Sequence, residues 1–360
     1  MTQMTPQPGI MDIELYVGGK SAIAGRDNVL KLSSNENPLG PVPAAVEAAA
    51  AAAVEMHRYP STDHAGLRAA IGEIWGLDPA RVICGAGSDE VLQFVTQAYA
   101  GQGDEIIHTA HGFSLYPVLI RAASATPVCV PEAERRVDVD AILGAVTART
   151  KMVLLTNPGN PTGTRLPDAD LARLVEGLPE RIILVIDAAY AEYTDGYDGG
   201  ASYAATRPNV LMTRTFSKIY GLGGLRIGWG YGPQAMIDVM NRLRQPFNLS
   251  TVQLAAAEVA VRDTDWVARC QALNADQRAR LTGALGQLGI ACDPSETNFV
   301  LARFADEAEA SSAEAAFVAD GILIRRVTGY GFPEGLRITV GDVDQTGRVI
   351  DVLNRWRAAA

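Results

Sequence analysis

The sequence has few of the residues that form disulfide frameworks, metal sites and nucleic-acid-binding surfaces. Its 360 residues include only four cysteines and four histidines. The cysteines form no C-x-x-C pair, and the histidines are too scattered to suggest a metal site. Basic side chains are fewer than acidic ones, 31 against 41. The net charge of -10 is unfavourable for binding nucleic acid or an anionic membrane, so we expect neither partner and no metal.

Targeting and membrane signals are also missing. The N-terminus has no charged segment followed by an apolar one, and no apolar run approaches the length of a membrane-spanning helix. Each cysteine lies in an apolar run, which predicts reduced and mostly buried thiols. We therefore expect a cytoplasmic protein. The cysteines are Cys84, Cys129, Cys270 and Cys292.

The composition and the order of patterns predict two domains and an arm. Apolar residues make up 48% of the chain, enough for a sizeable core. From about residue 80, short runs of consecutive apolar residues alternate with helical stretches, which is typical of a parallel sheet buried on both faces. We expect an N-terminal arm at 1–36, packing with the small domain and with a partner subunit. A large α/β domain at 37–245 and a small α+β domain at 246–360 follow.

Polar residues stand directly after several of these apolar runs. The turn at 85–89 leads into a helix N-terminus, whose backbone N–H groups suit an anion. In open α/β sheets, ligands bind at the carboxyl ends of the strands, so these groups should meet at one edge. The groups that follow the next three runs are the segment NPGNPTG with Asn160, then Asp187 and Tyr190, then Thr215, Ser217 and Lys218.

Each feature also has an ordinary structural interpretation. The glycine turn could be a plain strand–helix connection, Asp187 could cap the chain, and Asn-Pro-Thr-Gly is a common turn composition. Lys218 could extend its ammonium to the surface. These interpretations do not explain why all the groups follow strands, or why Lys218 stands in an apolar, glycine-rich segment. A lysine there is costly unless it is paired or neutral, and a neutral lysine can form a Schiff base with a carbonyl.

A lysine, a carboxylate and a phosphate cradle are what pyridoxal 5'-phosphate requires. The segment TFSKIYGLGGLRIGWGYG (215–232) resembles the lysine segment of the fold-type-I aminotransferases that use this cofactor. More narrowly, it is similar to the histidinol-phosphate aminotransferase branch. The other segments of that branch occur in its order over nearly the whole chain: LSSNENPLGP, RYP, GAGSDE, FSLY, NPGNPTGT, DAAYAEY and LRITVG.

The resemblance implies a fold and a set of catalytic residues. The fold is α/β, with a large domain whose mostly parallel, seven-stranded sheet lies between helices, and a smaller α+β domain. Lys218 would bind the cofactor and later move the proton between the substrate Cα and the cofactor. Asp187 would pair with the ring nitrogen. Tyr190 and Asn160 would hydrogen-bond the phenolate oxygen of the ring.

The resemblance also implies how the rest of the cofactor is held. Phe113 would stack on the ring. The phosphate would be bound by Ser88, Asp89, Thr215, Ser217 and Arg226. In the family a tyrosine of the partner subunit completes this phosphate site, and Tyr59 matches it. A homodimer with shared active sites follows from that match.

Four residues match substrate-binding positions of the branch. Arg337 matches the arginine that binds the anionic end of the substrate, although it could also be an outward-facing strand arginine. Arg325 matches a second arginine for the substrate phosphate, with Arg326 beside it as an alternative register. Tyr16 and Asn35, on the arm, match positions that close over the substrate.

The chain departs from the common family pattern at three places. Ala188 replaces an acid that often follows the ring-pairing aspartate, and Gly159 replaces a common asparagine. The pair His111-Gly112 stands where Pro-Thr often precedes the stacking aromatic. None of these positions has a chemical role in the scheme above, so they leave the cofactor prediction unchanged.

The predicted activity is a ping-pong transamination. The substrates would be L-histidinol phosphate and 2-oxoglutarate, and the products imidazole acetol phosphate and L-glutamate, a step of histidine biosynthesis. An aromatic amino-acid aminotransferase is the alternative, because an arginine can receive a carboxylate or a phosphate. A decarboxylase of phosphorylated amino acids is a third possibility. A regulator with an aminotransferase-like domain is disfavoured, because only a short arm precedes the first helix and the charge is acidic.

Overall fold

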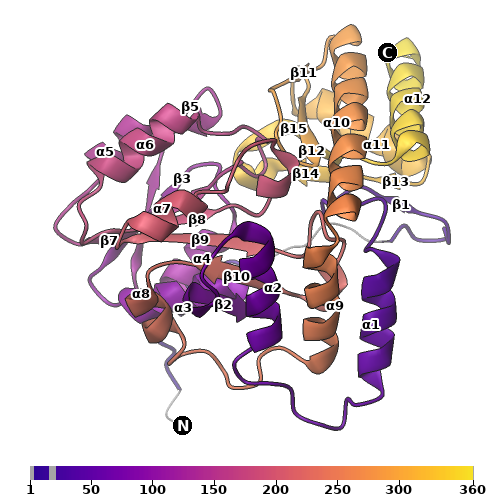
Figure 1. The fold of residues 1–360 in the computed structure, drawn as a ribbon. Coiled ribbons are helices and arrows are strands. Elements are labelled where there is room, and N and C mark those ends of the chain that lie inside the picture. The colour runs from indigo at the N-terminus through magenta and orange to yellow at the C-terminus, as the bar shows by residue number, and fades with distance from the viewer. Residues whose placement is uncertain (1–3, 16–21, 360) are drawn as a thin grey trace.

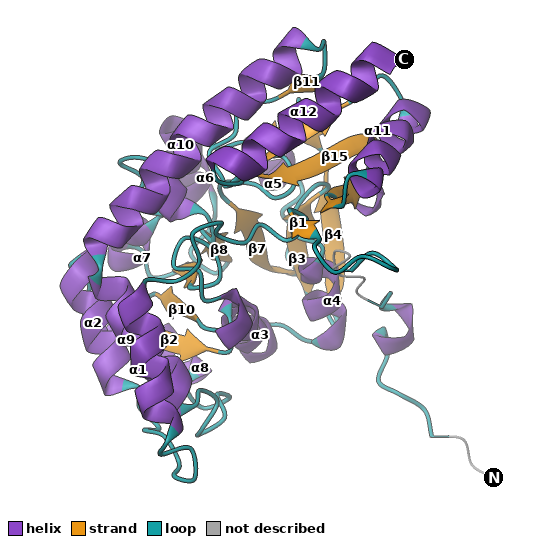
Figure 2. Cartoon of the chain, turned by 90° about the vertical axis from the view of Figure 1, so that its right-hand side faces the viewer, coloured by secondary structure: helices purple, strands orange, loops and turns teal. Residues whose placement is uncertain are grey.

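The computed structural model describes residues 4–15 and 22–359, which form a larger and a smaller body (Figure 1). The larger body has a seven-stranded sheet with helices on both faces, and the smaller body has a four-stranded sheet. Two long helices, α10 (Thr264–Gln287) and α12 (Val343–Ala359), lie side by side over the smaller sheet (Figure 2).

The larger sheet has the strand order β2-β10-β9-β8-β7-β3-β4. The strands from β9 to β4 pair in parallel, and β10 pairs antiparallel with both β9 and β2. The prediction of a mostly parallel, seven-stranded sheet is confirmed. The strands are β2 (Val82–Gly85), β3 (Glu105–Thr109), β4 (Thr126–Val130), β7 (Thr150–Thr156), β8 (Ile183–Asp187), β9 (Val210–Thr215) and β10 (Gly228–Tyr231).

Alternate residues of these strands face two different apolar cores. In β8, Leu184 and Ile186 belong to one core, and Ile183 and Val185 belong to the other. Both faces are buried, which explains why the strands are apolar on consecutive residues. The first core includes α1 (Pro43–Ala53), α2 (Ala65–Trp75), α5 (Val139–Gly144), α6 (Asp168–Gly177), α7 (Ala201–Thr206) and α9 (Thr251–Arg262), and the second includes α3 (Ser88–Tyr99), α4 (Leu115–Ala122) and α8 (Gln234–Met240).

The sequence pattern does not predict strand β10, because two of its four residues are glycines, which normally weaken a strand. The structure shows what they allow. A Cβ atom on Gly228 would lie 2.1 Å from the backbone nitrogen of Ser88, so only glycine permits this approach. Trp229 and Tyr231 alternate with the glycines and are buried in the core. Strand β10 therefore lies between β2, which leads to the turn before Ser88, and β9, which leads to Lys218.

The smaller sheet is antiparallel throughout, with the order β11-β12-β15-β14. Helix α11 (Glu307–Ala319) packs on β15, and α12 packs on α10 and α11. The strands are β11 (Ala291–Cys292), β12 (Phe299–Arg303), β14 (Arg325–Val327) and β15 (Phe332–Thr339). In the larger body, β5 (Glu132–Ala133) and β6 (Arg136–Val137) pair antiparallel as a separate two-stranded ribbon.

The end of the N-terminal arm is part of the smaller body. Strand β1 (Leu30–Lys31) pairs in parallel with β13 (Ile322–Leu323), and Leu32 is buried in the core of the smaller body. Earlier in the arm, a short 3-10 turn at Ile10–Asp12 lies against α4 of the larger body. The arm thus contacts both bodies within one chain.

The two bodies meet within α10 rather than at residue 245, where we expected the boundary. Helix α9 packs against α1 and α2, and its apolar residues lie in the core of the larger body. Helix α10 carries Cys270 in that same core, and Leu281 and Leu285 in the core of the smaller body. The sequence pattern places this boundary too early, because α9 packs on α1 and α2, which are distant from it in the chain.

Each of the four cysteines is a free thiol. Cys84 and Cys270 are buried and Cys292 is partly buried, whereas Cys129 is exposed on the edge strand β4, contrary to the expectation of burial. In the part of the chain that the structure describes, no helix is long and apolar enough to cross a membrane. Within the same ranges, no group of three or more potential ligands could hold a metal ion.

Candidate active site

A cavity of about 180 Å³ lies where the carboxyl ends of β7, β8 and β9 face the smaller body. All of the predicted site residues except Tyr16 and Tyr59 contribute to its wall. The wall consists of Ser33, Ser34, Asn35, Ser88, Asp89, Phe113, Thr156, Asn160, Asp187, Ala189, Tyr190, Thr215, Ser217, Lys218, Arg226, Arg325, Tyr330 and Arg337.

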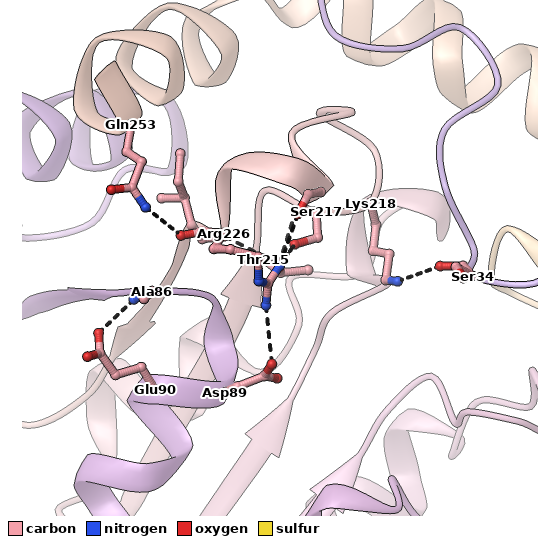
Figure 3. Close-up of polar contacts among 11 residues, drawn as sticks. Ser34, Ala86, Asp89, Glu90, Thr215, Ser217, Lys218, Arg226 and Gln253 are labelled. Atoms are coloured by element: carbon pink, nitrogen blue, oxygen red, sulfur yellow. Dashed lines mark hydrogen bonds and ion pairs between the residues drawn. The ribbon is translucent and has the colours of Figure 1, made fainter. Parts of the chain in front are cut away.

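One end of the cavity is formed by the N-terminus of α3. Gly87 is the N-cap of this helix, and Ser88 is its first helical residue. The Glu90 carboxylate accepts a hydrogen bond of 2.7 Å from the backbone N–H of Ala86, which fixes the turn (Figure 3). The backbone N–H groups at the start of the helix and its positive dipole end therefore favour an anion at this place.

Arg226 adds a full positive charge to this end. Its guanidinium donates to the hydroxyl of Ser217 at 3.0 Å and to the Asp89 carboxylate at 3.2 Å (Figure 3). The side-chain amide of Gln253 donates to the carbonyl of Arg226 at 3.0 Å, which fixes its backbone. A guanidinium between the hydroxyl-bearing end of β9 and a helix N-terminus suits a phosphate group.

Asp187 ends strand β8 and is buried. Its oxygens accept hydrogen bonds from hydroxyl groups, Tyr116 at 3.0 Å and Thr213 at 3.2 Å. Burial raises the pKa of Asp187 to about 6, the negative charge of Asp89 adds to this rise, and the hydrogen bond from Tyr116 opposes it. A buried carboxylate held by neutral donors would be stabilised by a cationic N–H in the cavity.

Lys218 follows strand β9 and directs its ammonium to the carbonyl of Ser34 on the arm, at 3.3 Å (Figure 3). The ammonium also lies 5.6 Å from the centre of the Tyr190 ring. Burial and then the positive charge of Arg337 lower the pKa of Lys218 to about 8. The lowered pKa increases the minor share of Lys218 that is the neutral amine near neutral pH, which is the nucleophilic form.

Asn160 and Tyr190 are both oriented by neighbours so that each can donate a hydrogen bond. The amide of Asn35 donates to the Tyr190 oxygen at 2.9 Å, which leaves the phenol proton to point elsewhere. Burial raises the pKa of Tyr190, so it stays a neutral donor. Arg337 donates to the Oδ1 atom of Asn160 at 2.6 Å, so the amide nitrogen of Asn160 is on the other side. Two such donors suit an anionic oxygen.

The smaller body contributes two arginines to the cavity. Arg325 on β14 and Arg337 on β15 are directly opposite in the antiparallel register, so their side chains leave the same face of the sheet. Arg337 also donates to the carbonyl of Ser33 at 2.9 Å. Arg326 is the next residue on β14, so its side chain leaves the opposite face of the sheet. Its guanidinium donates to Ser311 at 2.6 Å and to the carbonyl of Pro333. The structure thus places Arg325, and not Arg326, at the cavity.

Several contributing residues had no predicted role. Tyr116 and Thr213 donate hydrogen bonds to Asp187. Their positions in the sequence, close to the predicted site residues Phe113 and Thr215, could have indicated that they belong to the site. Tyr116 lies three residues after Phe113, and their rings meet edge to face at 5.9 Å. Thr213 lies two residues before Thr215 on the same face of β9. The carbonyls of Ser33 and Ser34 gave no signal, because a backbone carbonyl carries no sequence information.

Two predicted residues are not part of this cavity. Tyr16 lies outside the described residues. Tyr59 is 82% exposed and stacks on the ring of Phe247 at 4.4 Å, in the loop after α1. Within one chain, Tyr59 does not line the cavity with Arg226.

Taken together, the cavity has an anion-binding end, a buried carboxylate, two oriented donors and a partly neutral lysine. This set fits a phosphorylated aldehyde that carries a basic ring nitrogen and an acidic ring hydroxyl. Arg325 and Arg337, which the smaller body contributes to the same cavity, suit a second anion.

Comparison with known proteins gives consistent results. Residues 27–353 match the model of the family described as aminotransferase class I and II. The histidinol-phosphate aminotransferase of Ruegeria pomeroyi is 62% identical over 359 residues, covering 100% of this chain and 99% of that one. The protein of the same name from Dinoroseobacter shibae is 59% identical over 360 residues, with 100% of both chains covered.

Solved structures show the same fold. The crystal structure of a histidinol-phosphate aminotransferase from Sinorhizobium meliloti in complex with pyridoxal-5'-phosphate matches with a TM-score of 0.90 and 26% identity, covering 99% of each chain. An aspartate aminotransferase from Thermus thermophilus with maleate matches with a TM-score of 0.79 and 22% identity, covering 91% of each chain. The second likeness concerns the fold alone.

Proposed function

Because this chain belongs to the aminotransferase class I and II family, we propose that it uses pyridoxal 5'-phosphate to transfer the amino group of L-histidinol phosphate to 2-oxoglutarate. The products are imidazole acetol phosphate and L-glutamate, and the reaction is a step of histidine biosynthesis. The identity of 56–62% to curated relatives named histidinol-phosphate aminotransferase, over nearly their full length, supports this donor.

The opposed arginines Arg325 and Arg337 are the structural observation that carries the choice of donor. Like charges directly opposite on neighbouring strands repel, so their placement favours an anion between them. A phosphate carries close to two negative charges at neutral pH and accepts forked hydrogen bonds from two guanidinium groups. A carboxylate carries one charge, so phenylalanine or tyrosine would neutralise the pair less well.

The roles of the residues follow from their places in the cavity. The cofactor, when bound, supplies a ring that withdraws electrons from the substrate Cα. Asp187 would hold the ring nitrogen in its protonated form, and Asn160 and Tyr190 would donate hydrogen bonds to the ring oxygen. Lys218 would take the proton from the substrate Cα, since its lowered pKa makes it a base near neutral pH. Ser217 and Arg226 would hold the phosphate.

A half-reaction tests the donor. Holoenzyme is mixed with L-histidinol phosphate or with L-phenylalanine, and the loss of the bound cofactor's visible absorption is followed. Much faster loss with histidinol phosphate is expected. Equal or faster loss with phenylalanine would favour the aromatic aminotransferase. Release of carbon dioxide from a phosphorylated amino acid would favour the decarboxylase.

We further propose that the protein is a homodimer with shared active sites. Tyr59, which matches the partner-contributed phosphate ligand, is exposed at a distance from its own cavity. The larger body exposes other apolar side chains in the segments that follow α1 and α8. These are Val54, Met56, Leu243 and Phe247. A second copy would cover this surface and receive Tyr59.

Mixing of inactive variants tests the shared site. Lys218→Ala and Tyr59→Ala chains are each prepared alone and then refolded together. In a shared arrangement, the mixed dimer has one site with both Lys218 and Tyr59 intact, so activity should rise well above that of either variant. If Tyr59 serves its own chain, mixing restores no activity.

We also propose that the protein acts in the cytoplasm. Its four free thiols agree with this location, and cell fractionation would test it.

A further inference from the structure

His111 has no role in the scheme above, although it lies two residues before Phe113. It follows β3, and its Nδ1 atom is 2.7 Å from the carbonyl oxygen of Tyr330 in the smaller body. The imidazole ring also packs on Phe332, with 4.2 Å between ring centres. His111 therefore contacts the smaller body at two points from the loop that leads to the ring-stacking residue.

The segment that His111 contacts is the tip of the hairpin formed by β14 and β15. This hairpin carries Arg325 and Arg337 opposite each other, and a register shift after Arg326 bends it toward its tip. Tyr330 is at the tip, where its hydroxyl lies 3.0 Å from the hydroxyl of Ser114. The hairpin tip is thus attached to the larger body on both sides of Phe113, through His111 and Ser114.

The attached tip also forms part of the site. Tyr330 and Arg325 line the cavity that contains Lys218, and both also line a second cavity of about 440 Å³ between the arm, α4 and the hairpin. Any shift of the tip would change the wall between these two cavities. It would also move Arg325 and Arg337 relative to Phe113.

We propose that His111 is a positioning residue that sets the distance between the cofactor-stacking face of the site and the arginine pair, and thereby the affinity for the phosphorylated donor. This inference depends on the proposed function for the identity of the donor. The hydrogen bond from His111 to Tyr330 fixes the hairpin tip, and the hairpin carries the pair. His111 touches neither Lys218 nor Asp187 in this arrangement, so it acts on binding rather than on proton transfer.

Histidine suits this task for a physical reason. A carbonyl can only accept, so Nδ1 of His111 must carry the hydrogen and act as the donor. Gly331, next to Tyr330, has φ of 84°, and a Cβ there would lie 3.4 Å from the His111 ring. A proline at position 111, as in the common family pattern, could donate no such bond.

Three variants at one position test the role of the hydrogen bond. His111→Leu removes the donor and keeps an apolar side chain. His111→Asn places an amide N–H close to where Nδ1 lies, and His111→Gln carries its amide one bond further. For each variant, kcat and KM for L-histidinol phosphate, the affinity for pyridoxal phosphate and the melting temperature are measured on purified holoenzyme.

We expect His111→Leu to raise KM for histidinol phosphate about three- to tenfold, the range for one lost hydrogen bond, with kcat changed less than about twofold. His111→Asn should restore KM, and His111→Gln should not. The affinity for pyridoxal phosphate should stay that of the wild type. An unchanged KM in His111→Leu, or equal impairment by Asn and Leu, would overturn the proposal. If His111→Leu does not fold, the difference in KM between His111→Asn and His111→Gln decides the question.

The failure of the proposed function is a separate outcome. If the wild-type enzyme does not convert histidinol phosphate, that function is wrong. The positioning role is then decided by KM for 2-oxoglutarate in the same variants, because its carboxylates need the same arginines. We again expect KM to rise in His111→Leu and His111→Gln and to stay close to the wild-type value in His111→Asn.

Discussion

The two ends of the active site are built in different ways. At the cofactor end, Asp187, Thr215 and Ser88 stand at the ends of neighbouring strands or at the start of the helix that follows one. At the substrate end, the arm and strand β15 meet although 304 residues separate the residues that bond. The backbone N–H of Asn35 donates to Thr339 at 3.0 Å, and Arg337 donates to the carbonyl of Ser33. The first end depends on one sheet, and the second depends on how the arm and the smaller body assemble.

The two ends also differ in charge. The cofactor end contains a buried carboxylate with a raised pKa, whereas the substrate end contains two arginines that face each other. Lys218 connects the two ends, because it follows β9 and donates to the carbonyl of Ser34 on the arm. Burial and the positive charge of Arg337 lower its pKa. The difference suggests that changes at the first end affect chemistry and cofactor binding, and that changes at the second affect substrate binding. The following predictions test that division.

The largest effect is expected at the residue that connects the two ends. Lys218→Ala should lower kcat at least about 10³-fold, because it removes the group that moves the proton. The variant should still fold and should no longer bind pyridoxal phosphate covalently, as measured by mass spectrometry after borohydride treatment. Lys151→Ala, at a half-exposed position on β7, is the control and should keep normal activity. Covalent cofactor in Lys218→Ala would show that another residue holds it.

At the cofactor end, Asp187→Asn should lower kcat by about 10²-fold or more, because a neutral amide cannot hold the ring nitrogen protonated. KM for histidinol phosphate should change little. Asp238→Asn, at an exposed position on α8, should behave as wild type. If Asp187→Asn instead raised KM with kcat unchanged, the division between chemistry and binding would be wrong.

At the substrate end, neighbouring residues make a matched pair. Arg325→Gln should raise KM for histidinol phosphate about 10- to 100-fold, since it removes a charge-assisted contact to the phosphate. Arg326→Gln should have a much smaller effect, because its guanidinium bonds Ser311 and the carbonyl of Pro333 instead. Steady-state kinetics with both variants checks this. Equal effects would mean that the hairpin as a whole, rather than Arg325, binds the phosphate.

The smallest effect concerns the pH dependence at the cofactor end. In the cofactor-free protein the pKa of Asp187 is raised to about 6, so its carboxylate is lost as pH falls through that value. Affinity for pyridoxal phosphate should therefore decrease below about pH 6. The hydrogen bond from Tyr116 favours the carboxylate, so Tyr116→Phe should move this decrease to higher pH and leave the affinity at pH 8 nearly unchanged. Fluorescence titration across pH 5–8 measures both, and an unmoved profile would exclude this role of Tyr116.

The sequence alone determined the sheet and the cofactor end. Consecutive apolar runs are required wherever both faces of a strand are covered, so β8 and its terminal Asp187 could be predicted from local pattern. Gly221 and Gly228 near Lys218 also have a structural reason, because a Cβ atom would lie 2.4 Å from the backbone of Gly40 and 2.1 Å from that of Ser88. Strand β10 could not be predicted, because its two glycines resemble a turn until the adjacent strands are known.

Only the tertiary structure decided the substrate end. Whether Arg325 or Arg326 faces the cavity depends on the pairing of β14 with β15, and no local pattern sets that register. The contact between His111 and Tyr330 joins loops of two bodies through a backbone carbonyl, which has no residue type to recognise. Local sequence specifies which groups a strand end presents. Contacts between distant segments depend on how separate cores pack, and that packing is a property of the whole chain.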